Sequence, residues 1–248
     1  MLALSRPVGR GWYVRDSMAV ASGISAADIA LLRSIGIRFA AVNMSHPVTM
    51  RRLQTAGIFA WVFGLPSQWS PSSWRETLAR SHRVALEVGA PRIWADPENG
   101  WPQASPTEWV ALGAALGELA RSGIQVAVTT HGGLRSRVAR YIAPQIAPFG
   151  GIISPQLYDH SRDASLDYAA ASLPVWTRTM AGCQVVPSVG CLSTGPDGPG
   201  AYSDARYAAV FRHYPRAWSA AIVWPERDPS PAQAAVLRAW RVGIGPEL

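Results

Sequence analysis

Short apolar segments of β-strand character alternate with alanine-rich segments of helical character along the whole chain. The expected strands are 11–14, 38–43, 58–64, 92–96, 124–130, 151–158, 184–190 and 220–225. The expected helices follow them one by one, near 25–35, 46–56, 71–88, 106–122, 134–147, 163–181, 203–213 and 230–242. Because strands buried on both faces are almost continuously apolar, this alternation predicts a parallel sheet covered by helices.

Local signals support the limits of several of these helices. Ser25 and Ser105 are expected N-caps, and Ser105 is followed by a proline suited to the first helical turn. Five glycines are expected to end helices before the next strand: Gly36, Gly57, Gly89, Gly123 and Gly182.

Eight β/α units in 248 residues match the size of a (β/α)8 barrel, also called a TIM barrel. We expect one such domain over residues 1–248, since no linker or change of composition marks a second one. The alternative is an open, doubly wound sheet, which usually carries a glycine-rich phosphate loop after its first strand. Residues 11–18, GWYVRDSM, do not form such a loop.

The charge of the chain limits its partners. The formal net charge is +7, and every basic residue is an arginine. A positive charge favours association with anionic partners such as nucleic acid, cell-wall polyanions or membrane surfaces. No run of five basic residues occurs, so we expect no nucleic-acid-binding arm. No apolar run approaches the length of a membrane span.

No metal or cofactor site is expected. The five histidines lack paired metal-binding spacing. Cys183 and Cys191 lie near the two ends of one expected strand, beyond disulfide reach, and are expected to be thiols.

Polar candidates gather at one end of the expected strands, and the opposite ends are much poorer in them. Active sites of such barrels lie at the carboxyl ends of the strands. Those ends carry Arg15 and Asp16, Asn43, Gln68 and Trp69, Asp96 and Glu98, Thr129 to His131, Gln156 to Asp159, and Trp224. This asymmetry predicts a functional site at the carboxyl end.

The fourth strand ends in two carboxylates, Asp96 and Glu98. Residues two apart on a strand face the same side, about 6.5–7 Å apart along the backbone. Two close carboxylates cannot both ionise easily, so the pKa of one is raised, giving the acid and base that glycoside hydrolysis requires. The alternative is a polar turn in which Asp96 caps a backbone amide and Glu98 is solvated.

Other side chains at this end are suited to bind a sugar. Gln156 and Tyr158 share one face of the sixth strand and are expected to hold N-acetyl or hydroxyl groups. Trp224 is expected to contact the apolar face of a pyranose. Trp69 and Trp101, in loops, are expected to be exposed and to line sugar subsites, or alternatively to anchor their loops.

These residues resemble two families of barrel glycoside hydrolases, the chitinase-like family (family 18) and the barrel-type lysozymes (family 25). In the chitinase-like family the fourth strand ends in D-x-x-D-x-D-x-E, the sixth carries M/Q-x-Y-D/N, and the eighth ends in tryptophan. This chain matches the last two acids as Asp96 and Glu98, the sixth strand as QLYD (156–159), and the eighth as Trp224. The two earlier acids of the motif fall on Pro91 and Trp94.

The resemblance implies a role for each matched residue. Glu98 would be the general acid, Asp96 would orient the N-acetyl group that acts as nucleophile, and Tyr158 would hydrogen-bond the same group. The lysozymes need only the D-x-E pair and an aspartate near the end of the first strand, for which Asp16 is the candidate. Further substrate contacts are expected from the other polar and aromatic candidates: Gln156, Asp159, Trp224, Trp101, Asn43 and Trp69.

We therefore expect a glycosidase that cleaves β-1,4 linkages of an N-acetylhexosamine polymer, with peptidoglycan as the expected substrate. The alternative is a non-catalytic barrel that binds glycan or is a structural module of a larger assembly, such as a phage particle. A phosphate-handling barrel is a third hypothesis, because the amides after His131 resemble an anion site. Residues 1–14 lack the long apolar stretch of a signal peptide, so we expect synthesis in the cytoplasm and delivery to the cell envelope by lysis, a virion or a secretion machine.

Overall fold

The computed structural model describes residues 7–14, 16, 18–157, 168–180, 182–191, 194–195, 198–199, 204–213, 219–225 and 229–240. Within this part, nine strands form one sheet in the order β7-β6-β5-β4-β3-β2-β1-β11-β8, and each adjacent pair is parallel. The strands are β1 (Gly9–Val14), β2 (Ile37–Asn43), β3 (Phe59–Phe63), β4 (Arg92–Ala95), β5 (Gln125–Thr130), β6 (Ile152–Pro155), β7 (Gln184–Val185), β8 (Ser188–Cys191) and β11 (Ala220–Pro225). A separate antiparallel pair joins β9 (Thr194–Gly195) to β10 (Gly198–Pro199).

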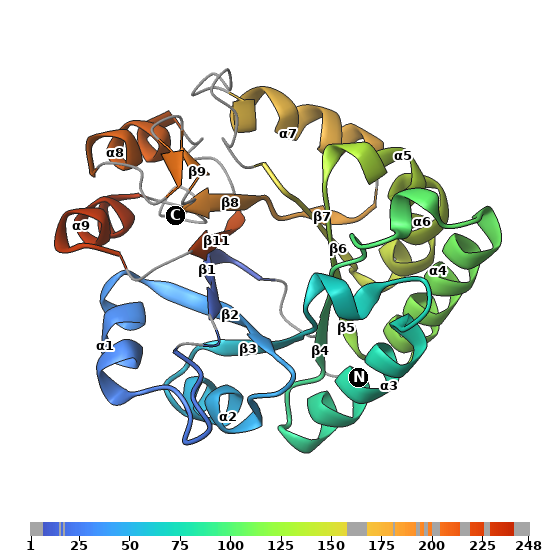
Figure 1. Cartoon of the computed structure of the whole chain (residues 1–248), viewed down its shortest axis with the longest axis horizontal. Helices are drawn as coiled ribbons and strands as arrows, with labels where there is room; N and C mark the ends of the chain where they lie inside the picture. The colour runs from blue at the N-terminus through green and yellow to red at the C-terminus, as the bar shows by residue number, and fades with distance from the viewer. Residues whose placement is uncertain are drawn as a thin grey trace, which may run out of the picture.

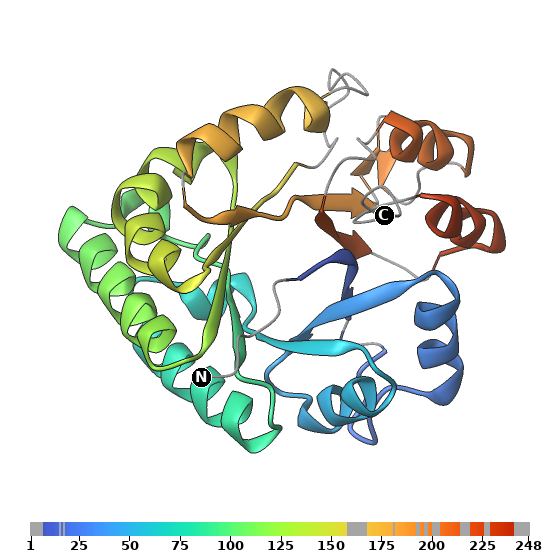
Figure 2. The same cartoon turned by 180° about the vertical axis from the view of Figure 1, so that it is seen from behind.

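Helices surround this sheet on the outside (Figures 1 and 2). They are α1 (Ala26–Ser34), α2 (Pro47–Thr55), α3 (Trp74–Glu87), α4 (Pro106–Arg121), α5 (Arg135–Arg137), α6 (Ala143–Ile146), α7 (Tyr168–Thr179), α8 (Asp204–His213) and α9 (Pro231–Ala239). Short 3-10 turns are η1 (Pro66–Trp69), η2 (Trp101–Gln103), η3 (Gly132–Leu134) and η5 (Ala147–Phe149), and η4 (Val138–Ile142) is a π-helical turn. No helix in the described ranges is long and apolar enough to cross a membrane.

Residues 184–191 close the barrel. Their first part, β7, pairs with β6, and their second part, β8, pairs with β11. Between them, the Val186 amide donates to the Ile153 carbonyl and the Ile222 amide to the Pro187 carbonyl, both at 2.9 Å. The expected single strand over 184–190 is therefore divided in two, at a proline that has no amide hydrogen to donate. The expected (β/α)8 barrel is confirmed.

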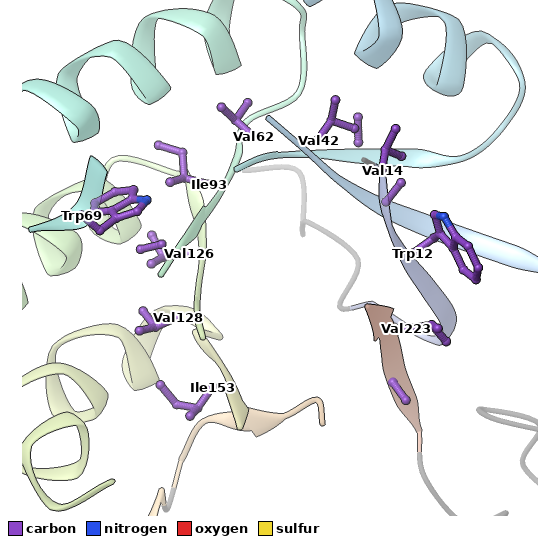
Figure 3. Packing of buried hydrophobic residues seen from close by; sticks show 14 of the residues in the cluster. Trp12, Val14, Val42, Val62, Trp69, Ile93, Val126, Val128, Ile153 and Val223 are labelled. Carbon is purple, nitrogen blue, oxygen red and sulfur yellow. The ribbon is translucent and has the colours of Figure 1, made fainter. Parts of the chain in front are cut away.

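Side chains alternate between the two faces of the strands, as the two-residue period of a strand requires. One buried cluster fills the barrel interior and includes Tyr13, Phe39, Trp61, Phe63 and Trp94. There the Trp61 and Trp94 rings meet edge to face, with centroids 5.4 Å apart. A second cluster packs the outer faces of the strands against the helices, and Figure 3 shows part of it.

The expected caps are present. The Ser25 hydroxyl accepts a hydrogen bond from the Asp28 amide, and the Ser105 hydroxyl from the Glu108 amide, at 3.0 and 3.3 Å. The five expected helix-ending glycines all have φ between +65° and +96°, a region that favours glycine. One expected helix differs, because residues 134–147 form the sequence η3, α5, η4, α6 and η5 rather than one continuous helix.

Candidate active site

Asp96 and Glu98 follow β4 directly and continue its alternation. Trp94 faces the barrel interior, so Asp96, two residues later, is placed on the same inner side. Asp96 is completely buried, whereas Glu98 is half-buried. The Glu98 amide donates to the Asp96 carbonyl at 3.0 Å, which folds the chain into a tight turn between the two acids. The Asp96 carboxyl therefore lies below the mouth of the barrel, and the Glu98 carboxyl lies at the mouth.

Burial raises the pKa of Asp96 well above its usual value, and the negative charge of Glu98 raises it further. Both Asp96 oxygens are inaccessible to solvent, and neither receives a hydrogen bond from a donor in the described part of the chain. The alternative of Asp96 as an amide cap therefore does not fit.

The sixth strand brings an amide to this pair. The Gln156 side chain donates from Nε2 to Oε1 of Glu98. The Gln156 backbone is itself fixed, because its amide donates to the Thr130 carbonyl at 2.8 Å and the residue bridges to Ser188. The structure thus brings together two of the residues that the sequence placed at the site from distant segments.

No arginine pairs with Glu98 within the described ranges. Arg92, at the opposite, amino end of β4, places its guanidinium 5.0 Å from the centre of the Phe59 ring. An arginine partner would favour a purely structural role for Glu98, and the described ranges contain none.

Asp16, at the end of β1, pairs with a histidine that the sequence did not select. Its Oδ1 lies 3.2 Å from Nε2 of His46, and its side chain is 54% exposed. Tyr13, also not selected, links this region to the buried acid: burial, then the charges of Asp16 and Asp96, raise the pKa of its hydroxyl. Its signal in the sequence was weak, since only the register of β1 shows that it faces inward.

The expectation that Trp69 and Trp101 are exposed is wrong. Both side chains are 0% exposed and belong to the outer cluster, where Figure 3 shows Trp69. The Trp101 ring packs edge to face on Trp109, with centroids 4.8 Å apart. Their loops form 3-10 segments, η1 and η2, each with a proline in its first turn, and both indoles are directed into the layer between the strands and the helices. In this conformation the two indoles anchor loops and present no surface to a sugar.

Other candidates have local partners or lie outside the described residues. Asn43 is buried, and its side-chain oxygen accepts from the Ser45 amide at 3.0 Å, which shapes the turn after β2. The His131 ring accepts from the Gly133 amide at 3.1 Å, so one amide of the supposed anion site is already occupied. Tyr158, Asp159 and the side chain of Trp224 lie outside the described residues. Among the described residues, no three histidine, cysteine, aspartate or glutamate side chains form a group able to hold a metal.

Comparisons with known proteins show the fold. No protein-family model matches the sequence, and no curated protein matches it. The catalytic domain of a GH18 chitinase from the fern Peteris ryukyuensis is similar in structure, with a TM-score of 0.64 and 12% identity over 93% of this chain and 97% of that one. The GH18 chitinase ChiB of Flavobacterium johnsoniae has a TM-score of 0.62 and 9% identity, over 95% of this chain and 94% of that one.

A third similar structure holds a ligand. The second catalytic domain of a group II chitinase from Ostrinia furnacalis was solved with a penta-N-acetyl chito-oligosaccharide. It has a TM-score of 0.51 and 12% identity, over 79% of this chain and 70% of that one. At these identities the three likenesses establish the barrel architecture of this chain.

Proposed function

We propose that this protein is a glycoside hydrolase that cleaves β-1,4 linkages in a polymer with a chitin-like, N-acetylhexosamine backbone. The observation that carries the proposal is the pair at the end of β4: a fully buried Asp96 with a raised pKa beside a half-buried Glu98 that receives the Gln156 amide. Two carboxyls in different environments are the arrangement that separates acid and base roles in glycosidases. The structural likeness to chitinases supports the same reaction class.

In this proposal Glu98 donates a proton to the glycosidic oxygen as the bond to the leaving sugar breaks and the oxygen of the substrate's own N-acetyl group bonds to the anomeric carbon. Water then attacks that carbon and displaces the N-acetyl oxygen, and the Glu98 carboxylate takes a proton from this water, which restores the acid. The Gln156 amide holds the Glu98 carboxyl in place. Asp96 shares the proton of the pair with Glu98 and orients the N-acetyl group of the substrate, and Tyr158 is the expected partner of the same group.

Two polymers are candidate substrates, a chitin-like glycan and peptidoglycan. The chito-oligosaccharide bound by the Ostrinia furnacalis domain favours the first, and the net charge of +7 favours an anionic wall polymer. The lysozyme-like arrangement, with Asp16 as an additional acid, has less support because Asp16 pairs with His46. Delivery to a cell envelope stays a prediction from the sequence.

The test is release of soluble product from purified peptidoglycan and from a soluble chito-oligosaccharide. We expect the wild type to cleave at least one of them, and Glu98→Gln to lower the rate by about 10²-fold or more because it removes the transferable proton. Glu118→Gln, the same change on the exposed face of α4, is the matched control and should leave the rate unchanged. Cleavage that survives in Glu98→Gln would contradict the assigned acid.

The competing function is a non-catalytic glycan-binding or structural module. It predicts that the wild type retains binding to one of the polymers and releases no product from either. That result would replace the hydrolase proposal.

A further inference from the structure

A pocket lies in the helical layer, between segments that begin at the same end of the barrel as Asp96 and Glu98. It has a volume of about 260 Å³ and is lined by Pro106, Trp109, Ser136, Arg137, Arg140 and Tyr141. These residues come from the start of α4, from α5 and from η4, and η4 packs against α4. Since α4 and α5 begin after the carboxyl ends of β4 and β5, the pocket belongs to the rim of the barrel mouth.

Arg137 is held in a fixed position at this pocket. Its Nη1 donates to two backbone carbonyls, those of Trp101 at 3.1 Å and Ala104 at 2.9 Å, and the residue is half-buried. These two bonds use both hydrogens of Nη1, which leaves the hydrogens of Nη2 and Nε for a ligand. The same bonds connect Arg137 to η2, which begins three residues after Glu98.

Arg140 places a second guanidinium at the pocket. Its central carbon lies 5.3 Å from the centre of the Tyr141 ring. Within the described ranges, neither Arg137 nor Arg140 pairs with a carboxylate. Glu108, the acid between the pocket residues Pro106 and Trp109, instead accepts hydrogen bonds from the amide and the hydroxyl of Ser105 in the capping box. Two cations thus line one pocket without an anionic partner in the described part of the chain.

The wall that carries these arginines packs unusually close to α4. A Cβ atom at Gly113 would lie 2.0 Å from the Tyr141 carbonyl oxygen, so a residue without a side chain is needed there. The Tyr141 carbonyl belongs to the π-helical turn η4, a geometry often found at functional sites. The close contact holds the backbone of Arg140 and Tyr141 at a constant distance from α4. This reduces the conformational entropy that the pocket would lose when a ligand binds.

We propose that this pocket binds a carboxylate carried by the glycan, with Arg137 and Arg140 as its ligands and the Ser136 hydroxyl as a further donor. Planar guanidinium groups match carboxylates in geometry and charge. The inference rests on the proposed function and narrows its substrate: a neutral chitin chain has no such group, whereas an N-acetylhexosamine chain with lactyl or peptide carboxylates does. The pocket therefore favours a carboxylate-bearing polymer of the peptidoglycan type.

The experiment measures binding by calorimetry in a Glu98→Gln background, so that the ligand is not consumed. The probes are an N-acetylhexosamine tetramer with lactyl and peptide carboxylates, the same tetramer with those carboxylates amidated, and neutral chitotetraose. We expect the carboxylated tetramer to bind about tenfold more tightly than its amidated form, as charge-assisted hydrogen bonds allow. Adding Arg140→Gln or Arg137→Gln should reduce that ratio to less than about threefold.

Arg178→Gln is the matched control, because it removes the same charge from an exposed position at the far end of α7 and should keep the ratio. Arg140 is exposed, so its variant keeps the test valid if Arg137→Gln fails to fold.

A ratio near one in the starting protein, no binding of the carboxylated tetramer, or a ratio that survives both substitutions would overturn the proposal. Cleavage of chitotetraose by the wild type without a carboxylate preference would contradict the pocket alone. A preference without any cleavage would contradict the catalytic proposal alone.

Discussion

The side-chain amide of Gln156, just beyond β6, donates a hydrogen bond to the carboxyl of Glu98, in the loop after β4. β5 separates these two strands in the sheet, so the bond spans the carboxyl end of β5. A half-buried carboxyl is thereby held in one position without an arginine partner in the described ranges. The orientation of Glu98 depends on this amide.

Replacing Gln156 by leucine removes the donor and preserves much of the side-chain volume. A hydrogen bond contributes about 0.5–1.5 kcal/mol, so we expect the cleavage rate to fall by up to about tenfold. Binding of the oligosaccharide should change less, because the amide acts on the Glu98 carboxyl. Steady-state kinetics separates these effects, and an unchanged turnover number with a raised KM would indicate that Gln156 binds substrate instead.

Asp96 should make the stability of the protein depend on pH. Because burial raises its pKa, the folded protein keeps this proton at pH values where the unfolded chain, with an aspartate pKa of about 3.9, has lost it. The stabilising contribution is therefore complete below that value and is lost as the pH rises through the raised folded-state pKa. Asp96→Asn cannot ionise, so it should not show this loss.

At pH 7 we expect the free energy of unfolding of Asp96→Asn to exceed that of the wild type by about 1 kcal/mol or more. This is the scale of the cost of a buried polar group without a hydrogen-bond partner, as the Asp96 carboxyl is within the described ranges. The difference should shrink as the pH falls toward 4. Urea denaturation at several pH values measures it, and a difference independent of pH would show that Asp96 is not protonated in the folded protein. The same variant should lose at least about tenfold in cleavage rate, because an amide cannot share a carboxyl proton with Glu98.

Trp101 should affect stability and leave substrate binding unchanged. Its indole is fully buried against Trp109, so Trp101→Ala should destabilise the fold by about 3–5 kcal/mol. The milder Trp101→Phe allows KM to be measured in a folded protein, and we expect KM to stay within about twofold of the wild-type value. A KM raised tenfold in Trp101→Phe, with the melting temperature unchanged, would restore the sugar-subsite hypothesis.

The barrel was predictable because its signals are local. The eight apolar segments, the caps at Ser25 and Ser105 and the glycines with positive φ each depend on a few neighbouring residues. The division of residues 184–191 depends on what Pro187 pairs with across two neighbouring strands, which the local pattern does not reveal. Likewise, the π-helical turn η4 arises where the backbone meets Gly113 on another helix.

The position of the candidate site was predictable as far as the strand ends were. Asp96, Glu98 and Gln156 were selected because parallel strands deliver their carboxyl ends to one edge, and the structure brings them together. The exposure of Trp69 and Trp101 was predicted wrongly because a loop position alone does not show whether a 3-10 turn directs the side chain into the layer between the strands and the helices. The pairing of Asp16 with His46 joins two loops, and no spacing in the sequence encodes it.

The most direct test of Glu98 as the general acid compares two chito-oligosaccharide glycosides that differ only in the leaving group. A sugar leaving group needs a proton, whereas 2,4-dinitrophenolate leaves without one. We predict that Glu98→Gln lowers the rate by about 10²-fold or more on the first substrate and by less than about tenfold on the second. An equal loss on both substrates would contradict the assignment of Glu98 as proton donor.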